Sequence, residues 1–156
     1  MLDHDDLLTR TFDLAAHARD AGDHPFSSLL AIDGVIVAEA LNRVNTDRDL
    51  TAHAETMLVR VLEREGRLAL LDEGVVYASC EPCPMCVGAM FWAGARRVVY
   101  GLSSERLTDL ATAPGAERVG FTITAPEIGS AAEPAMSFDG PHREDDAAVA
   151  HLGFWY

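Results

Sequence analysis

The stretch Thr51-Ala52-His53-Ala54-Glu55, followed further along by Pro82-Cys83-Pro84-Met85-Cys86, decides both the fold and the chemistry expected of this chain. His53, Cys83 and Cys86 offer one imidazole and two thiolates, all of them common zinc ligands. Three such ligands leave a tetrahedral zinc with one position open for water. Glu55 supplies a carboxylate that can move protons beside that water. The pattern predicts a zinc hydrolase with one zinc ion per subunit.

The spacing of these residues predicts how they are presented. Cys83 and Cys86 are three residues apart, so one helical turn places both sulfurs on one side. Each ligand stands near an expected helix start, where backbone N–H groups favour a thiolate. His53 and Glu55 are two apart, and a regular helix would separate them by about 200°. They can converge only if His53 lies at the irregular entry of its helix.

Hydrophobic periodicity and turn residues predict the helices and strands on either side of the two motifs. Asp33-Gly34 separates two apolar runs, 26–32 and 35–42, and predicts a hairpin. Helices are expected at 3–20, 52–65, 84–93, 104–111 and 142–152, strands at 75–79, 97–101 and 119–123, and loop at 43–51 and 126–140. This order predicts an α/β fold with a mixed sheet covered by helices on both faces.

Composition limits the possible functions. The 156 residues carry a formal net charge of -13, and every one of the 12 cationic side chains is Arg. No basic face of the kind that binds nucleic acid is visible. No apolar run has the length of a membrane span. The acidic start, Met1 to Asp6, lacks the features of a secretory signal, so a cytoplasmic protein is expected.

The two motifs, together with several flanking residues, resemble the cytidine deaminase-like superfamily, in particular its guanine deaminase and tRNA adenosine deaminase branch. The signature itself is a known one. The flanking matches are Pro25-Phe26, Asp33-Gly34, Asn42, Ser79-Cys80-Glu81, Gly88-Ala89 and Trp92-Ala93. The resemblance implies a three-layer α/β/α sandwich with a mixed five-stranded sheet. It also implies one deaminase domain over residues 1–156, with 141–156 as a C-terminal lid or swapped segment, and a homodimer.

The resemblance further implies roles for individual residues. Activated water attacks an amine-bearing ring carbon, and Glu55 carries its proton to a ring nitrogen and then to the departing amine, which leaves as ammonia. Asn42 and the Ala54 N–H would bind the ring edge, and the Ser79 main chain would face the leaving group. Phe26 and Trp92 would line the apolar faces of the ring. Substrate contacts from the tail are expected from His151, Trp155 and Tyr156.

Three functions remain open at this point. The favoured one is deamination of a free ring such as guanine, cytosine or a related aminated heterocycle. The second is adenosine deamination in tRNA, which the acidic C-terminal end disfavours. The third is a non-catalytic domain in which Cys80 joins the other ligands in a closed Cys3His zinc site. Within the first, Glu105 or Asp109 is a candidate second carboxylate, although neither falls in a matching motif.

Overall fold

The computed structural model describes residues 1–156, and its sheet begins with the predicted hairpin. Strands β1 (Ser27–Ile32) and β2 (Val35–Leu41) are antiparallel and joined through Asp33 and Gly34. Both turn residues have positive φ, at 50° and 73°. Asp-Gly is suited to such a turn, because Gly adopts positive φ without strain and Asp tolerates it. The hairpin prediction is confirmed.

Three further strands complete one five-stranded sheet in the order β2-β1-β3-β4-β5. They are β3 (Val75–Cys80), β4 (Arg97–Leu102) and β5 (Ser137–Asp139). β1 pairs antiparallel with both neighbours, whereas β3, β4 and β5 run parallel to one another. The sheet is therefore mixed, as the order of the elements predicts.

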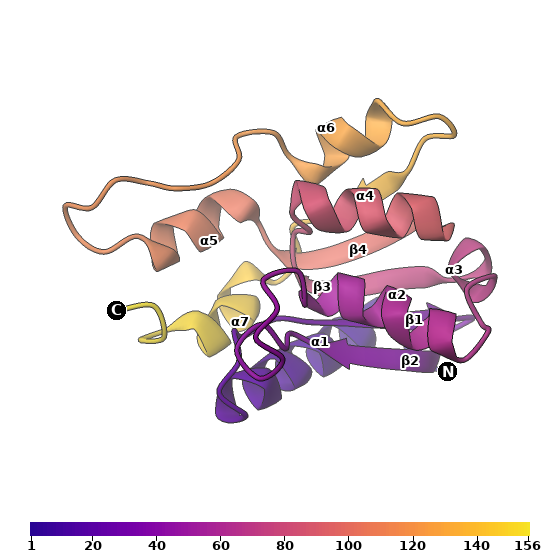
Figure 1. Ribbon diagram of the computed structural model, residues 1–156, viewed down its shortest axis with the longest axis horizontal. Coiled ribbons are helices and arrows are strands. Elements are labelled where there is room, and N and C mark those ends of the chain that lie inside the picture. Colours follow the sequence, from indigo (N-terminus) through magenta and orange to yellow (C-terminus); the bar gives the residue numbers. More distant parts are fainter.

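Alternation along the central strands divides the core into two layers. One set of strand residues, which includes Leu30, Val76 and Val98, packs in a single cluster with apolar side chains of α2 (Ala54–Arg64) and α4 (Pro84–Ala93). The alternate set, which includes Leu29 and Tyr77, packs against α1 (His4–Asp20). Helices thus cover both faces of the sheet (Figure 1), and the three-layer prediction is confirmed.

Local chemistry explains where the principal helices begin and end. Asp3 and Asp6 form a capping box at the start of α1. Pro84 occupies the first turn of α4, where its missing N–H costs little, and Gly94 ends that helix in the left-handed conformation. The short helix α3 (Leu70–Glu73), just before β3, was not predicted.

The second half of the chain departs from the sequence-based expectation. Helix α5 (Ser104–Ala111) forms as predicted, but residues 119–123 form no strand, because no neighbouring strand pairs with them. The segment expected as loop instead contains α6 (Ala125–Ser130) and β5. A capping box between Thr124 and Glu127 starts α6. The absent side chain of Gly129 lets the helix approach β5: a Cβ there would lie 2.4 Å from the Met136 carbonyl.

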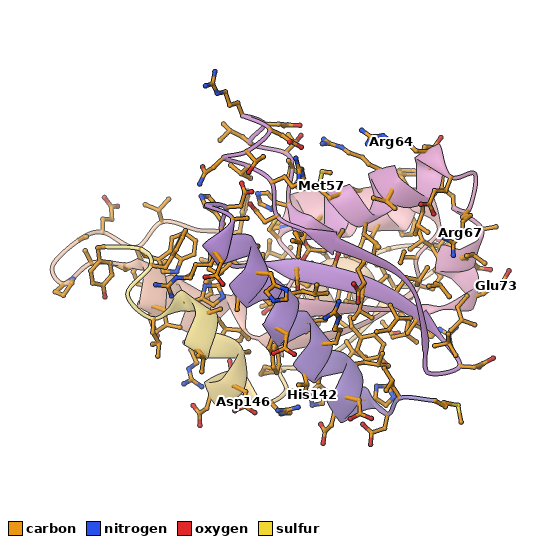
Figure 2. All side chains as sticks on the ribbon, turned by 90° about the horizontal axis from the view of Figure 1, so that it is seen from below. Met57, Arg64, Arg67, Glu73, His142 and Asp146 are labelled. Atoms are coloured by element: carbon orange, nitrogen blue, oxygen red, sulfur yellow. The ribbon has the colours of Figure 1, made fainter.

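The C-terminal segment docks on the N-terminal helix. It consists of α7 (Glu144–Ala148), the 3₁₀ turn η1 (Val149–His151) and the tail. The α-helix is therefore shorter than the helix predicted over residues 142–152. Figure 2 shows α1 and α7 side by side. Arg143, at the start of α7, donates to the Asp5 carbonyl and the Thr9 hydroxyl on α1. None of the helices combines the length and the apolar composition that a membrane span requires.

Candidate metal centre and active site

Two helix starts bring the predicted metal ligands together. His53 is the N-cap of α2 and Cys83 the N-cap of α4, and both have extended backbone. Neither side chain makes the usual capping hydrogen bond, so both remain free for another partner. His53 therefore lies just outside the regular helix, which begins at Ala54. This placement meets the condition under which His53 and Glu55 can converge.

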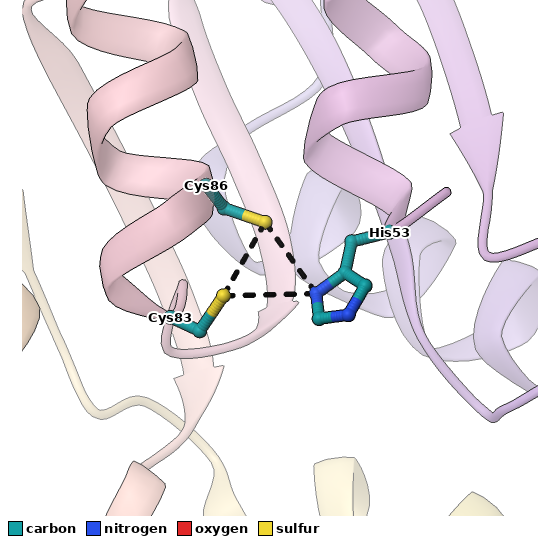
Figure 3. Close-up of side chains that lie close together, drawn as sticks. All are labelled: His53, Cys83 and Cys86. Atoms are coloured by element: carbon teal, nitrogen blue, oxygen red, sulfur yellow. Dashed lines mark hydrogen bonds between the residues drawn. The ribbon is translucent and has the colours of Figure 1, made fainter. Parts of the chain in front are cut away.

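The three ligand atoms form a nearly equilateral triangle (Figure 3). The His53 Nδ1 lies 3.6 Å from the Cys83 Sγ and 3.6 Å from the Cys86 Sγ, and the two sulfurs are 3.6 Å apart. Tetrahedral zinc, with Zn–S bonds of about 2.3 Å and a Zn–N bond of about 2.0–2.1 Å, places such atoms roughly 3.5–3.8 Å apart. The donor set and its spacing fit one zinc ion bound through Nδ1.

The electrostatics of the two thiols suit a cation site. Hydrogen bonding with Cys86 lowers the pKa of Cys83 to about 4, and the bond with His53 acts in the same direction. The contact with Cys83, together with burial, raises the pKa of Cys86. Hydrogen bonding with Cys83 raises the pKa of His53. One sulfur is therefore already anionic near neutral pH, and thiolate is the form that binds zinc.

Glu55 lies one residue inside the same helix and is buried. Burial raises the pKa of its carboxyl to about 7, and the charge of Cys83 adds to this shift. A carboxyl of this kind can both accept and release a proton near neutral pH, which general acid–base catalysis requires.

One small cavity joins these groups. Its volume is about 100 Å³, and it is lined by Phe26, Asn42, His53, Glu55, Cys80, Glu81, Cys83 and Leu107. Asn42 is oriented by the Val44 N–H, which donates to its Oδ1 at 3.1 Å. Its Nδ2 has no partner in the chain. The Ala54 N–H, the first of α2, likewise has no partner, as is usual at a helix start.

Two of the residues predicted to contact the substrate, Trp92 and Ser79, do not line this cavity with their side chains. Trp92, near the end of α4, is 85% exposed and does not line the cavity of its own chain, so its contact with the ring stays a prediction. Its exposure follows from its position on α4, where it points to solvent while Cys86 and Met90 face inward. The Ser79 side chain does not line the cavity either. It is buried, and its hydroxyl accepts a hydrogen bond from the Ser27 N–H.

Sequence reasoning missed two residues of the cavity wall. Glu81 accepts the Ser104 N–H at 2.9 Å with one oxygen and the Ala125 N–H at 2.8 Å with the other. It thereby ties the starts of α5 and α6 to the Pro82–Cys83 turn. Leu107 extends from α5 into the same wall. The available signals were the charge of Glu81 directly after a buried strand and the amphipathic pattern of α5.

The remaining candidates fall outside the metal group. The Cys80 side chain packs with Leu102, Ala147 and Ala148 and is not among the grouped ligand atoms. Asp109 pairs with Arg118 at 3.0 Å, and Glu105 lines a separate hollow of about 450 Å³ between α5 and residues 118–124. Neither carboxylate lines the cavity.

The predicted tail residues gather beside Phe26. His151 and Trp155 stack with ring centroids 5.9 Å apart. The Phe26 ring lies 5.1 Å from the His151 ring and 6.0 Å from the Trp155 ring. Tyr156 is mostly exposed. The tail therefore packs against Phe26, which forms one wall of the cavity, but does not line the cavity itself.

Comparison with known proteins places these features in a family. Residues 1–102 match the model described as the cytidine and deoxycytidylate deaminase zinc-binding region. A probable cytosine deaminase of Schizosaccharomyces pombe is 38% identical over 149 residues, which cover 95% of this chain and 90% of that protein. The crystal structure of guanine deaminase from Bacillus subtilis is 36% identical with a TM-score of 0.64, covering 75% of this chain and 73% of that one. A tRNA-specific adenosine deaminase of Agrobacterium fabrum is 35% identical over 92 residues, or 57% of this chain and 60% of that protein.

The geometry predicts which cysteines the metal needs. Cys80→Ser should leave the zinc content at about one ion per chain, whereas Cys86→Ser should lose most of it, because Cys86 belongs to the triangle of ligand atoms and Cys80 does not. Metal analysis of the purified, folded variants measures this. Loss of zinc from Cys80→Ser would instead support the closed Cys3His site.

Proposed function

The chain belongs to the family of zinc-binding cytidine and deoxycytidylate deaminases, and from this premise we propose that it hydrolyses the amino group of a free nucleobase-like ring. The product is the corresponding carbonyl compound, with release of ammonia. Cytosine, guanine and related aminated heterocycles are the candidate substrates. The names of the cytosine and guanine deaminase relatives support this substrate class.

One observation carries the proposal. The metal triangle, Glu55 and the free amide nitrogen of Asn42 meet at a cavity of only about 100 Å³. This is well below the roughly 300 Å³ at which pockets for drug-sized ligands begin. Such a cavity matches a single planar ring better than a nucleotide held within a polynucleotide. The net charge of -13 also disfavours a polyanionic substrate.

In the proposed mechanism, the three metal ligands and Glu55 have separate roles. His53, Cys83 and Cys86 would hold a zinc ion, which would lower the pKa of a water molecule so that it can act as a nucleophile near neutral pH. Glu55 would take one proton from the attacking water and pass it to a ring nitrogen. It would then take the second proton from the new hydroxyl, as the carbonyl forms, and give it to the departing amine, which leaves as ammonia. The buried position of Glu55 keeps this transfer away from bulk solvent.

Substrate orientation falls to Asn42 and Ala54. The Val44 N–H fixes the Asn42 Oδ1, so the amide presents its Nδ2 as a donor. The Ala54 N–H is a second donor. Together they complement a ring edge that carries hydrogen-bond acceptors, such as a carbonyl oxygen or an unprotonated ring nitrogen. Phe26 and Leu107 provide apolar walls, and the Ser79 main chain is proposed to face the leaving amine.

A homodimer is part of the proposal. Helix α4 contains no charged residue, yet Met85 and Trp92 on it are exposed. Ile123, which lines a shallow hollow together with Val87 and Phe91 of α4, is exposed as well. This uncharged surface stands out on a chain of net charge -13, because two copies can approach there without placing like charges in contact. A second copy of the chain is therefore the proposed partner.

Replacement of Glu55 tests the proton transfer. Glu55→Gln keeps the shape of the side chain and removes its basicity, so zinc content should remain and kcat should fall by about 10²–10⁴-fold. Steady-state ammonia release together with metal analysis measures both. Full activity in Glu55→Gln would exclude this residue as the proton carrier.

A substrate panel tests the reaction itself. Ammonia release should be detected with at least one free aminated base, should be weaker with the corresponding nucleoside, and should be absent with tRNA, because the cavity admits little beyond a ring. Turnover of tRNA at a rate above that of every free base would overturn the proposal in favour of the adenosine-editing alternative.

Substitution on α4 tests the dimer. Trp92→Glu should convert a dimer into a monomer, since it buries a charge in an apolar contact. Light scattering after size-exclusion chromatography measures the mass. Val35→Glu, at an exposed apolar position at the hairpin, is the matched control and should remain dimeric. Equal masses for both variants would show that the α4 surface is not the interface.

A further inference from the structure

The cavity at the metal group has one large apolar side chain that comes from the second half of the chain. Leu107, on α5, is the only lining residue that follows β4, since all the others lie between Phe26 and Cys83 in the sequence. Leu107, Leu110 and Phe26 pack against the small buried cluster around Leu102. Leu107 therefore shapes the cavity without belonging to the core that spaces the metal ligands.

Two carboxylates fix the start of α5, and with it the position of Leu107. The Ser104 N–H donates to Glu81 at 2.9 Å, and the Ser103 N–H and hydroxyl donate to one oxygen of Glu144 at 2.9 and 2.6 Å. The Leu107 N–H in turn donates to the Ser103 carbonyl at 2.9 Å. Glu81 follows β3 and Glu144 begins α7, so α5 is tied to two separate parts of the fold. A retreat of Leu107 from the cavity would strain these contacts.

The other large apolar wall, Phe26, is fixed as well. Its ring packs against the rings of His151 and Trp155, and the next residue, Ser27, is held by a hydrogen bond from its N–H to the Ser79 hydroxyl at 3.0 Å. Forcing extra atoms into such a packed surface displaces side chains and main chain together. The volume of about 100 Å³ is therefore close to the space that a bound ring has.

The polar groups of the cavity are few, and most of them already have a partner or a role. Each oxygen of Glu81 accepts a main-chain N–H. Glu55 is assigned to proton transfer, which leaves the Asn42 Nδ2 and the Ala54 N–H for the ring edge. The second ring of a purine base carries polar nitrogens of its own. Against the two apolar walls, these nitrogens would lose water without gaining a hydrogen bond.

We propose that Leu107 limits the substrate to a single six-membered aminated ring, of the pyrimidine or triazine type, and excludes fused two-ring bases. This inference rests on the proposed function and narrows its substrate class. The branched end of Leu107 takes the space that a second ring needs. One methylene group at an apolar wall changes selectivity by about 10- to 200-fold, and a fused ring is larger than a methylene group.

A matched pair of bases tests the size limit. Isocytosine is the six-membered ring of guanine without the fused ring, so both bases present the same amine to Glu55. In the wild-type protein, kcat/KM for isocytosine should exceed that for guanine by at least about 100-fold. Leu107→Ala opens the wall and should reduce this preference about 10- to 100-fold, mainly through a lower KM for guanine. Its zinc content should equal that of the wild type.

Leu110→Ala is the matched control. Leu110 lies about one turn later on α5, packs against the same buried cluster and does not line the cavity. Its variant should lose about as much melting temperature as Leu107→Ala and should keep the preference for isocytosine. Leu107→Val is a milder opening of the wall and provides the same test if Leu107→Ala does not fold. Lower activity toward both bases in the Leu107 variants, with the preference unchanged, would overturn the inference and leave Leu107 as packing.

Binding of the carbonyl products separates this inference from the reaction. Isocytosine would give uracil and guanine would give xanthine, and neither product carries an amine to remove. Calorimetric titration of the zinc-loaded wild-type protein should detect binding of uracil but not of xanthine, whereas Leu107→Ala should bind both. This result would support the size limit even if no free base released ammonia, which would itself refute the proposed function.

Two results would contradict the size limit. Tighter binding of xanthine than of uracil by the wild-type protein would overturn the inference, as would the absence of binding by either product. Faster turnover of guanine than of isocytosine would overturn it as well, while the proposed deamination of a free base would stand.

Discussion

The approach of two helix starts is the constraint on which the site depends. His53 and Cys83 are each the last extended residue before a helix, and neither side chain makes a capping hydrogen bond. Their ligand atoms come within 3.6 Å only because α2 and α4 pack together on the same face of the sheet. The buried cluster beneath them, with Leu30 and Val76 from the strands, fixes that spacing. The packing of the core therefore also sets the distances between the metal ligands.

The first hundred residues could be read from sequence because their signals are local. Asp33-Gly34 defines the hairpin, Pro84 and Gly94 bound α4, and short apolar runs mark the strands. The metal ligands were identifiable from residue type and spacing, and the convergence of His53 with Glu55 followed once His53 was placed at the helix entry. The three-layer fold was predicted from the order of elements and from family resemblance.

The second half could not be read in the same way, because its structure depends on distant partners. Residues 119–123 have a strand-like composition but no strand to pair with, whereas β5 is short and is defined only by its pairing with β4. Trp92 has the residue type of a ring-stacking wall, yet its place on α4 turns it to solvent. The position of Glu81 depends on two hydrogen bonds to distant main-chain N–H groups, which no local sequence pattern indicates.

The double contact of Glu81 has a consequence for how such a site can diversify. Its carboxylate binds only main-chain N–H groups, those of Ser104 and Ala125. Any sequence that offers two helix starts can satisfy it, whatever side chains follow. The region between residues 104 and 125 is therefore anchored through its backbone and left free in its side chains. Mutation there can reshape the wall against the ring, at Leu107 for example, while the anchor to the metal-bearing turn stays intact. Evolution of new ring preferences needs no change to the catalytic frame.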